Sequence, residues 1–168
     1  LVTHILKQLY DRKEIYKDSY EGWYCMPDER FWTEKDLVGG NCPECGREVD
    51  KIKEHNYFFK MSSYQNWLKE YIKLNDKFIQ PTSRRNEVLG FLEKPLGDLC
   101  ISRPKERLPW GIPLPFDENY VTYVWFDALI NYISAHGSIE KNKTPEFWPA
   151  NHQLIGKDIL TTHAVYWS

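Results

Sequence analysis

Residues 25–45 read CMPDERFWTEKDLVGGNCPEC, and this stretch says most about how the chain folds. Cys25 and Asp28 have two residues between them, and after thirteen more residues Cys42 and Cys45 repeat that spacing. Four ligands on two tight turns suit a structural Zn²⁺, and a carboxylate oxygen can take the place of one thiolate. The spacing predicts a zinc knuckle on these four residues. The alternative is a vestigial knuckle with free thiols, held by Trp23, Phe31 and Trp32.

The segments on either side of the cysteines predict a two-stranded ribbon. Residues 15–24 alternate apolar and polar side chains, and residues 49–59 form the expected return strand. Between them, Thr33 and Asp36 have the spacing of a capped helical turn over residues 33–37. Before the ribbon, apolar residues recur every three to four positions over residues 1–16, which predicts a helix.

The rest of the chain mixes expected helices with expected strands, separated by a proline-rich segment at residues 95–115. Apolar spacing predicts helices, and β-branched or aromatic runs predict buried strands. Helices are expected at residues 62–78, opened by Ser62 or Ser63, at 86–92, from 127 to 135 and from 157 onward. Strands are expected at residues 120–126 and 153–156.

Composition restricts the class of protein. The 168 residues are 42% hydrophobic with a formal charge of -2, which excludes a disordered chain and a wholly basic nucleic-acid binder. No apolar run approaches the roughly 20 residues that cross a bilayer, so no membrane partner is expected. Four cysteines with one C-x-x-C pair favour reduced thiols and a cytoplasmic location. The first residue is Leu1, not Met, so we expect a piece of a longer protein.

Three further motifs have both a chemical and a structural interpretation. Residues 60–63, KMSS, invite comparison with the KMSKS loop that neutralises ATP phosphates, but Tyr64 replaces its second lysine, so a helix cap is favoured. Residues 154–158, LIGKD, place a glycine and a carboxylate where a nucleotide can approach, or they form an ordinary cap. Residues 123–132 can line a small apolar pocket or simply pack in the core.

In chain order these motifs form a series with a known counterpart. The series is NYFFKMS at 56–62, FIQP at 78–81, RRNE at 84–87, SR at 102–103, WGIP at 110–113, YVWFDA at 123–128, WPA at 148–150 and IGKDI at 155–159, with His163 and Trp167. Across essentially the whole chain it resembles the methionyl-tRNA synthetases of bacterial type. Some of these pieces also occur in close class I relatives, whereas the NYFF segment after a single knuckle points to the methionyl family.

The resemblance implies an α/β fold: an incomplete Rossmann-like class I catalytic domain with a small zinc-knuckle β-ribbon insertion. Residues 1–17 would end the first Rossmann half, and 18–63 would be the connective peptide. Residues 64–115 would connect to part of the second half at 116–168. By the same resemblance, the methionine side chain would contact Trp125, Ala128, Tyr132, Ile159, His163 and Trp167. The ribose-binding part of the adenylate site would include Gly156 and Asp158.

The implied activity belongs to a longer enzyme. Methionine–tRNA ligase activates methionine with ATP and Mg²⁺ and transfers it to the acceptor end of tRNA(Met). The HIGH motif and the KMSKS loop, which hold the ATP phosphates, are missing from these 168 residues, so no catalytic residue is assigned and the chain alone is expected to be inactive. The alternatives are a stand-alone zinc-ribbon module that binds nucleic acid or protein, and an inert fragment.

Overall fold

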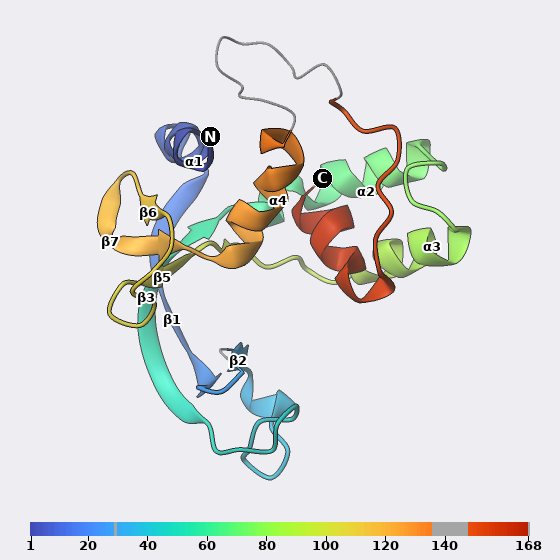
Figure 1. Cartoon of the computed structure of the whole chain (residues 1–168). Coiled ribbons are helices and arrows are strands. Elements are labelled where there is room, and N and C mark those ends of the chain that lie inside the picture. Colours follow the sequence, from blue (N-terminus) through green and yellow to red (C-terminus); the bar gives the residue numbers. More distant parts are fainter. Residues whose placement is uncertain (29, 136–147, 168) are drawn as a thin grey trace. The chain divides into compact units, whose positions relative to one another are not determined.

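A computed structural model describes residues 1–28, 30–135 and 148–167. The chain divides into two compact units, drawn in Figure 1. The first unit comprises residues 1–16 and 57–168, and the second comprises residues 17–56. No helix of the described residues is long and apolar enough to cross a membrane.

The second unit is built on the predicted ribbon. Its strands are β1 (Ile15–Cys25), β2 (Arg30–Trp32) and β3 (Asp50–Phe59); β1 begins and β3 ends in the first unit. The strand order of the sheet is β2-β1-β3-β4, and β1 pairs antiparallel with β2, with Trp23 opposite Trp32. The predicted capped turn is present as the short helix η1 (Glu34–Asp36), where the Thr33 backbone N–H donates to Asp36 at 3.0 Å.

The first unit contains a small antiparallel sheet beside helix α1 (Val2–Asp11). Strands β5 (Ser102–Pro104), β7 (Asp117–Thr122) and β6 (Pro113–Leu114) lie in the order β5-β7-β6. The short strand β4 (Leu99–Cys100) pairs antiparallel with the end of β3. Their shared core buries six apolar side chains from across the unit: Leu6, Ile15, Tyr57, Ile101, Leu114 and Tyr120.

The WGIP motif has a structural reason at its glycine. Gly111 has φ +137°, a conformation that L side chains rarely adopt. A Cβ at this position would lie 3.0 Å from the Cβ of Val121 on β7. The glycine therefore lets the chain lie close against β7, where Pro113 pairs with Val121.

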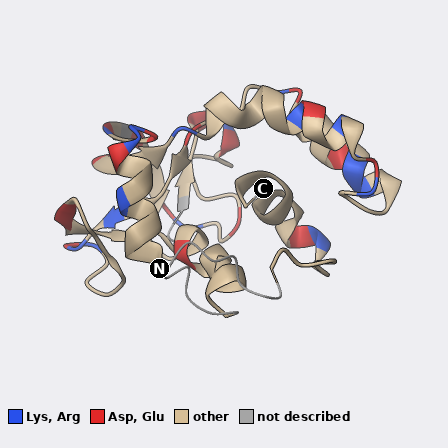
Figure 2. Cartoon of the chain, turned by 90° about the horizontal axis from the view of Figure 1, so that it is seen from above, with Lys and Arg blue, Asp and Glu red and all other residues tan. Residues whose placement is uncertain are grey.

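Helices make up the other part of the first unit. They are η2 (Met61–Tyr64), α2 (Gln65–Leu74), α3 (Thr82–Phe91), α4 (Val124–Ser134), η3 (Lys157–Ile159) and the π-helical turn η4 (Thr162–Tyr166). A second core joins α2 and α3 to the chain around η4, and it buries Leu68, Ile72, Ile79, Val88, Leu92, Leu160, Ala164 and Val165. Both acidic and basic residues lie along α2 and α3 (Figure 2), where Lys73 pairs with Glu70 and Arg84 with Glu87.

Several element boundaries differ from the sequence expectations. The strand expected at 120–126 ends at Thr122, and α4 begins at Val124, because helical spacing lets this segment bury Leu129 and Ile130. The helix expected at 62–78 is shorter, and neither Ser62 nor Ser63 caps it. Instead, the N-cap is Tyr64, and the Ser62 backbone N–H donates to Asp98 at 3.0 Å. The predicted serine cap is therefore wrong.

The strand expected at residues 153–156 is also absent. These residues form no strand, and the Leu154 side chain is 98% exposed. The Rossmann-like parallel sheet is not evident in the part of the chain that the structure describes. A strand needs a neighbour to satisfy its backbone hydrogen bonds, and here no described strand lies against this segment. The fold that the structure supports is a mixed α/β arrangement with a cysteine-bearing ribbon.

Candidate functional site

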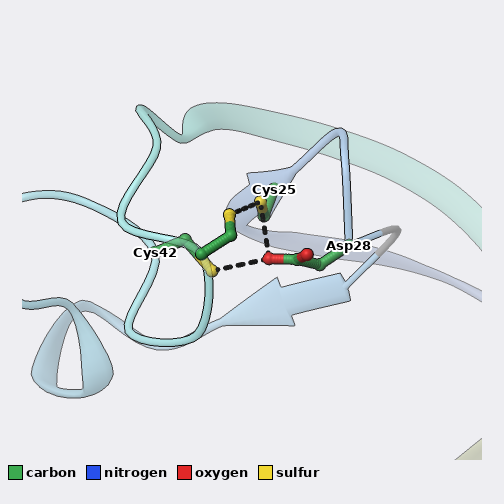
Figure 3. A group of neighbouring side chains, drawn as sticks. Cys25, Asp28 and Cys42 are labelled. Carbon is green, nitrogen blue, oxygen red and sulfur yellow. Dashed lines mark hydrogen bonds between the residues drawn. The ribbon is translucent and has the colours of Figure 1, made fainter.

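The four predicted metal ligands lie together in the second unit. One ligand atom from each of Cys25, Asp28, Cys42 and Cys45 lies within 4.8 Å of the others. The Sγ atoms of Cys25 and Cys42 donate to Oδ2 of Asp28 at 3.2 Å and 3.0 Å, and the Sγ atoms of Cys25 and Cys45 are 3.4 Å apart. In Figure 3 the side chains of Cys25, Asp28 and Cys42 point toward one another.

Two turns bring these ligands together. The first follows the end of β1, where the pairing of β1 with β2 places Cys25 at the start of the hairpin turn that carries Asp28. In the second, the Cys42 backbone N–H donates to Arg47 O at 2.8 Å, and the Gly46 N–H donates to Cys42 O at 2.9 Å. Gly46 adopts φ +71°, which a glycine tolerates without strain. The C-P-E-C-G sequence thus closes a tight loop.

The thiols and the carboxylate change one another's proton affinity. Burial raises the pKa of the Cys25 thiol to about 12. The hydrogen bond to Asp28 raises the pKa of Cys45, while the thiol donors, Cys45 first, lower the pKa of Asp28. The Asp28 carboxylate therefore accepts protons in hydrogen bonds from the thiols of Cys25 and Cys42. A divalent cation would have to displace those protons.

The donor set fits a tetrahedral metal ion. Ligands at about 2.0–2.3 Å from zinc lie about 3.3–3.8 Å from one another in a tetrahedron. Three of the separations here are 3.0–3.4 Å and all are within 4.8 Å, so the four atoms lie close to this spacing. The cluster can therefore bind a metal ion, and three thiolates with one carboxylate favour a borderline-soft cation over a hard one.

A second candidate site lies in the first unit, where an apolar cavity of about 430 Å³ opens among the helices. It is lined by side chains from α1, α2 and α4 and from the last described residues, among them four tryptophans: Trp67, Trp125, Trp148 and Trp167. Trp125 comes from the first turn of α4, and the rings of Trp148 and Trp167 meet edge to face, 6.0 Å apart. Such a cavity suits an apolar side chain of a ligand.

A hydrogen-bonded pair lies beside this cavity. The Tyr132 hydroxyl is 2.8 Å from Nε2 of the buried His163, and Nδ1 of His163 is 3.0 Å from the Ile159 carbonyl oxygen. A carbonyl can only accept, so Nδ1 carries a proton, and in the neutral tautomer that this requires Nε2 is free to accept from Tyr132. The Tyr132 ring is also 6.0 Å from that of Trp167. The pair is thus fixed from both sides of the imidazole.

The predicted pocket residues divide into two groups. The structure connects Tyr132, His163 and Trp167 by ring contacts, and Trp125 and Trp167 line the same cavity. Ala128 is exposed on α4, Ile159 contributes its carbonyl, and both Gly156 and Asp158 are exposed at η3.

Two residues that the sequence analysis did not assign to the pocket also line this cavity. Trp148 was quoted only as part of the WPA motif, and it lines the cavity. Met61, from the KMSS segment, is buried and lines the same cavity. Both are large apolar residues, which is the signal that could have indicated them.

Comparisons with known proteins identify the family. The family described as tRNA synthetases class I (M) matches residues 1–52 and 48–168. This chain belongs to the class I tRNA synthetases (M).

Relatives in that family are similar over the whole chain. Methionine–tRNA ligase of Clostridium perfringens is 57% identical over 99% of the chain, and that of Clostridium acetobutylicum is 54% identical over 99%. The chain spans about a quarter, 26%, of the length of each.

A solved structure matches as well. The methionyl-tRNA synthetase of Mycobacterium tuberculosis, bound by methionyl-adenylate, superposes with a TM-score of 0.85 at 39% identity. The match covers 99% of this chain and 34% of that one. The described units are therefore those of the family, and the cysteine cluster and the aromatic cavity are features of a class I synthetase chain.

Proposed function

We propose that this chain is part of a methionine–tRNA ligase and supplies the wall of its methionine pocket. The observation that carries the proposal is the aromatic cavity, on a chain 39% identical to a synthetase whose structure holds methionyl-adenylate. The parent enzyme would join the methionine carboxylate to the α-phosphate of ATP, releasing pyrophosphate. It would then transfer the methionyl group to the acceptor end of tRNA(Met).

Within this proposal the pocket residues divide the work of recognition. Trp125 and Trp167 provide aromatic walls for the methyl and methylene groups of methionine. Ala128 and Ile159 do not line the cavity, so their contact with methionine rests on the family resemblance alone. Because the Tyr132 proton is donated to His163, the Tyr132 oxygen presents lone pairs to its surroundings. A neutral, fixed Tyr132–His163 pair would exclude charged side chains and accept a thioether.

The nucleotide would lie next to this pocket. Gly156 has no heavy atom within 4 Å of the position a Cβ would take, so it leaves space for a ribose to approach the backbone. Asp158 is exposed in the first turn of η3, where its carboxylate can accept from ribose hydroxyls. ATP and its Mg²⁺ would be held mainly by the HIGH and KMSKS elements, which these 168 residues lack.

We also propose that the cysteine cluster binds one structural Zn²⁺ through Cys25, Asp28, Cys42 and Cys45. Support comes from the short separations of the four ligand atoms and from their donor chemistry. The metal would replace the thiol hydrogen bonds and hold the two turns of the second unit. Elemental analysis of chain purified without chelators should find one zinc per chain. Asp28→Cys should bind zinc more tightly, and Asp28→Ala more weakly.

The domain plan follows from the same proposal. Residues 1–17 end the first Rossmann half, 18–63 form the connective peptide, 64–115 connect, and 116–168 belong to the second Rossmann half. The parallel sheet would form only when the neighbouring strands of the longer protein are present. A cytoplasmic location is proposed from the four free cysteines.

An exchange assay tests the function. The longer protein that contains this chain should catalyse methionine-dependent exchange between ATP and pyrophosphate, and the 168-residue chain alone should not. Exchange that depends on another amino acid would refute the methionine assignment. Robust exchange by the isolated chain would show that the catalytic groups are misplaced.

The stand-alone zinc-ribbon alternative receives no support from charge. It requires a basic patch near the ribbon, but Lys51 pairs with Glu21 at 3.1 Å. The second unit carries ten acidic residues and six basic ones, a net charge of -4. Such a unit would repel a phosphate backbone.

A further inference from the structure

The second unit contains a cleft that is lined by none of the residues assigned to the proposed function. Its volume is about 260 Å³, and it is lined by Glu21, Gly22, Trp23, Trp32, Thr33, Glu34 and Lys51. All seven residues belong to the second unit, and none is a proposed metal ligand. The chemically distinctive members are two tryptophans and two carboxylates.

The strand register explains why these side chains share one face. Glu21 and Trp23 are two residues apart on β1, so they point to the same side of the sheet. Trp32 lies directly opposite Trp23 on β2. Lys51 comes from β3, which neighbours β1 on its other side. Three adjacent strands thus form a tryptophan floor with acidic groups at its edge.

The cleft already holds a cation from its own chain. The Lys51 ammonium lies 6.0 Å from the centre of the Trp23 ring and 3.1 Å from Oε1 of Glu21. An aromatic face and a carboxylate are the two groups that recognise an alkylammonium ion. The side chains of Lys51 and Glu21 are 57% and 53% exposed, so water screens their ion pair and it stabilises the chain little. A competing cation can therefore displace Lys51 at small cost.

We propose that this cleft binds an alkylammonium group that takes the place of Lys51. The charge of the second unit, -4, favours a cationic ligand and disfavours a nucleic acid. A free cation could approach the Trp23 ring more closely than Lys51, which is tied to β3 and whose ammonium lies 6.0 Å from the ring centre, and it would also meet Trp32 in the same cleft. The ligand is either a lysine side chain of a peptide or a free polyamine. This inference is independent of the proposed methionine chemistry.

Nuclear magnetic resonance of the zinc-loaded 168-residue chain tests the proposal. Butylammonium, which matches the lysine side chain, should shift the indole N–H signals of Trp23 and Trp32, and the neutral analogue 1-butanol should not. Lys51→Met removes the resident ammonium group from the cleft. It should therefore tighten butylammonium binding about two- to fivefold. Lys53→Met, on the same strand but outside the cleft, is the matched control for net charge and should leave binding as it was.

Four results would overturn the proposal. They are equal shifts with butylammonium and 1-butanol, no gain in Lys51→Met, an equal gain in Lys53→Met, and indole shifts caused by a short single-stranded oligonucleotide. The source of the ammonium group is decided by comparing trilysine with spermidine. Tighter binding of trilysine indicates a peptide, and tighter binding of spermidine indicates a polyamine.

Discussion

The Tyr132–His163 hydrogen bond gives the sharpest prediction about the first unit. Tyr132→Phe removes the hydroxyl that donates to Nε2 of His163 at 2.8 Å. His163 is 8% exposed, so water replaces that donor poorly. Loss of the donor to a buried acceptor costs about 1–3 kcal/mol. For a chain of this size, each kcal/mol lowers the melting temperature by about 2–4 °C, so we expect a fall of about 2–12 °C.

Thermal unfolding followed by circular dichroism measures this effect. Tyr71→Phe is the matched control, because Tyr71 is 38% exposed and its ring packs against Trp67 and Phe78, so its hydroxyl can be hydrated. The imidazole nitrogen shifts of His163 provide a second readout, since they should place the proton on Nδ1 in both the parent and Tyr132→Phe. An unchanged melting temperature, or a proton on Nε2 in the parent chain, would refute the hydrogen-bond assignment.

Three further predictions concern the fold and the cluster. Gly111→Ala combines a strained backbone with a Cβ contact of 3.0 Å to the buried Val121. Calorimetry should therefore show a loss of about 2–4 kcal/mol in the free energy of unfolding, and a loss below about 0.5 kcal/mol would contradict the strain argument. Because the pKa values of Cys25 and Cys45 are raised, zinc binding must release thiol protons. Zinc affinity, measured in competition with a chelator, should therefore rise with pH by up to about tenfold per pH unit for each proton released. A zinc affinity that does not change with pH would contradict protonated thiols. Asp98→Ala should cost about 1–2 kcal/mol, because Asp98 accepts from Ser62 and Tyr16. Burial opposes the charge of Asp98, but these donors lower its pKa overall, so its contribution should hold above pH 4 and fade in acid; an equal loss at pH 3 and pH 7 would refute it.

The sequence predicted those parts of the structure that local chemistry determines. The alternation of apolar and polar residues predicted β1, and β3 was expected as its return strand. The spacing of Thr33 and Asp36 predicted the capped turn. The cysteine spacing likewise brought four ligands together, because tight turns place residues i and i+3 side by side. These features depend on neighbours in the chain, so they can be read from a short window.

The remaining features depend on contacts between distant residues. Residues 124–126 suit a strand by composition, yet they form helix because Leu129 and Ile130 then reach the core. Ser62 is a good cap residue, but the distant Asp98 accepts its backbone N–H instead. Trp148 lines the cavity although its surroundings look like a loop. Of the pocket, the sequence alone could indicate aromatic residues, and their grouping required the resemblance.

The most direct test of the account is the methionine affinity of the longer protein when one cavity wall is removed. Calorimetric titration of Trp125→Ala should give a dissociation constant for methionine about 30- to 1,000-fold weaker than the parent, which corresponds to about 2–4 kcal/mol for loss of a buried aromatic wall. Trp110→Ala, at a residue that is 73% exposed and outside the cavity, should bind methionine as the parent does. Equal affinities for all three proteins would show that the cavity at Trp125 is not the methionine pocket.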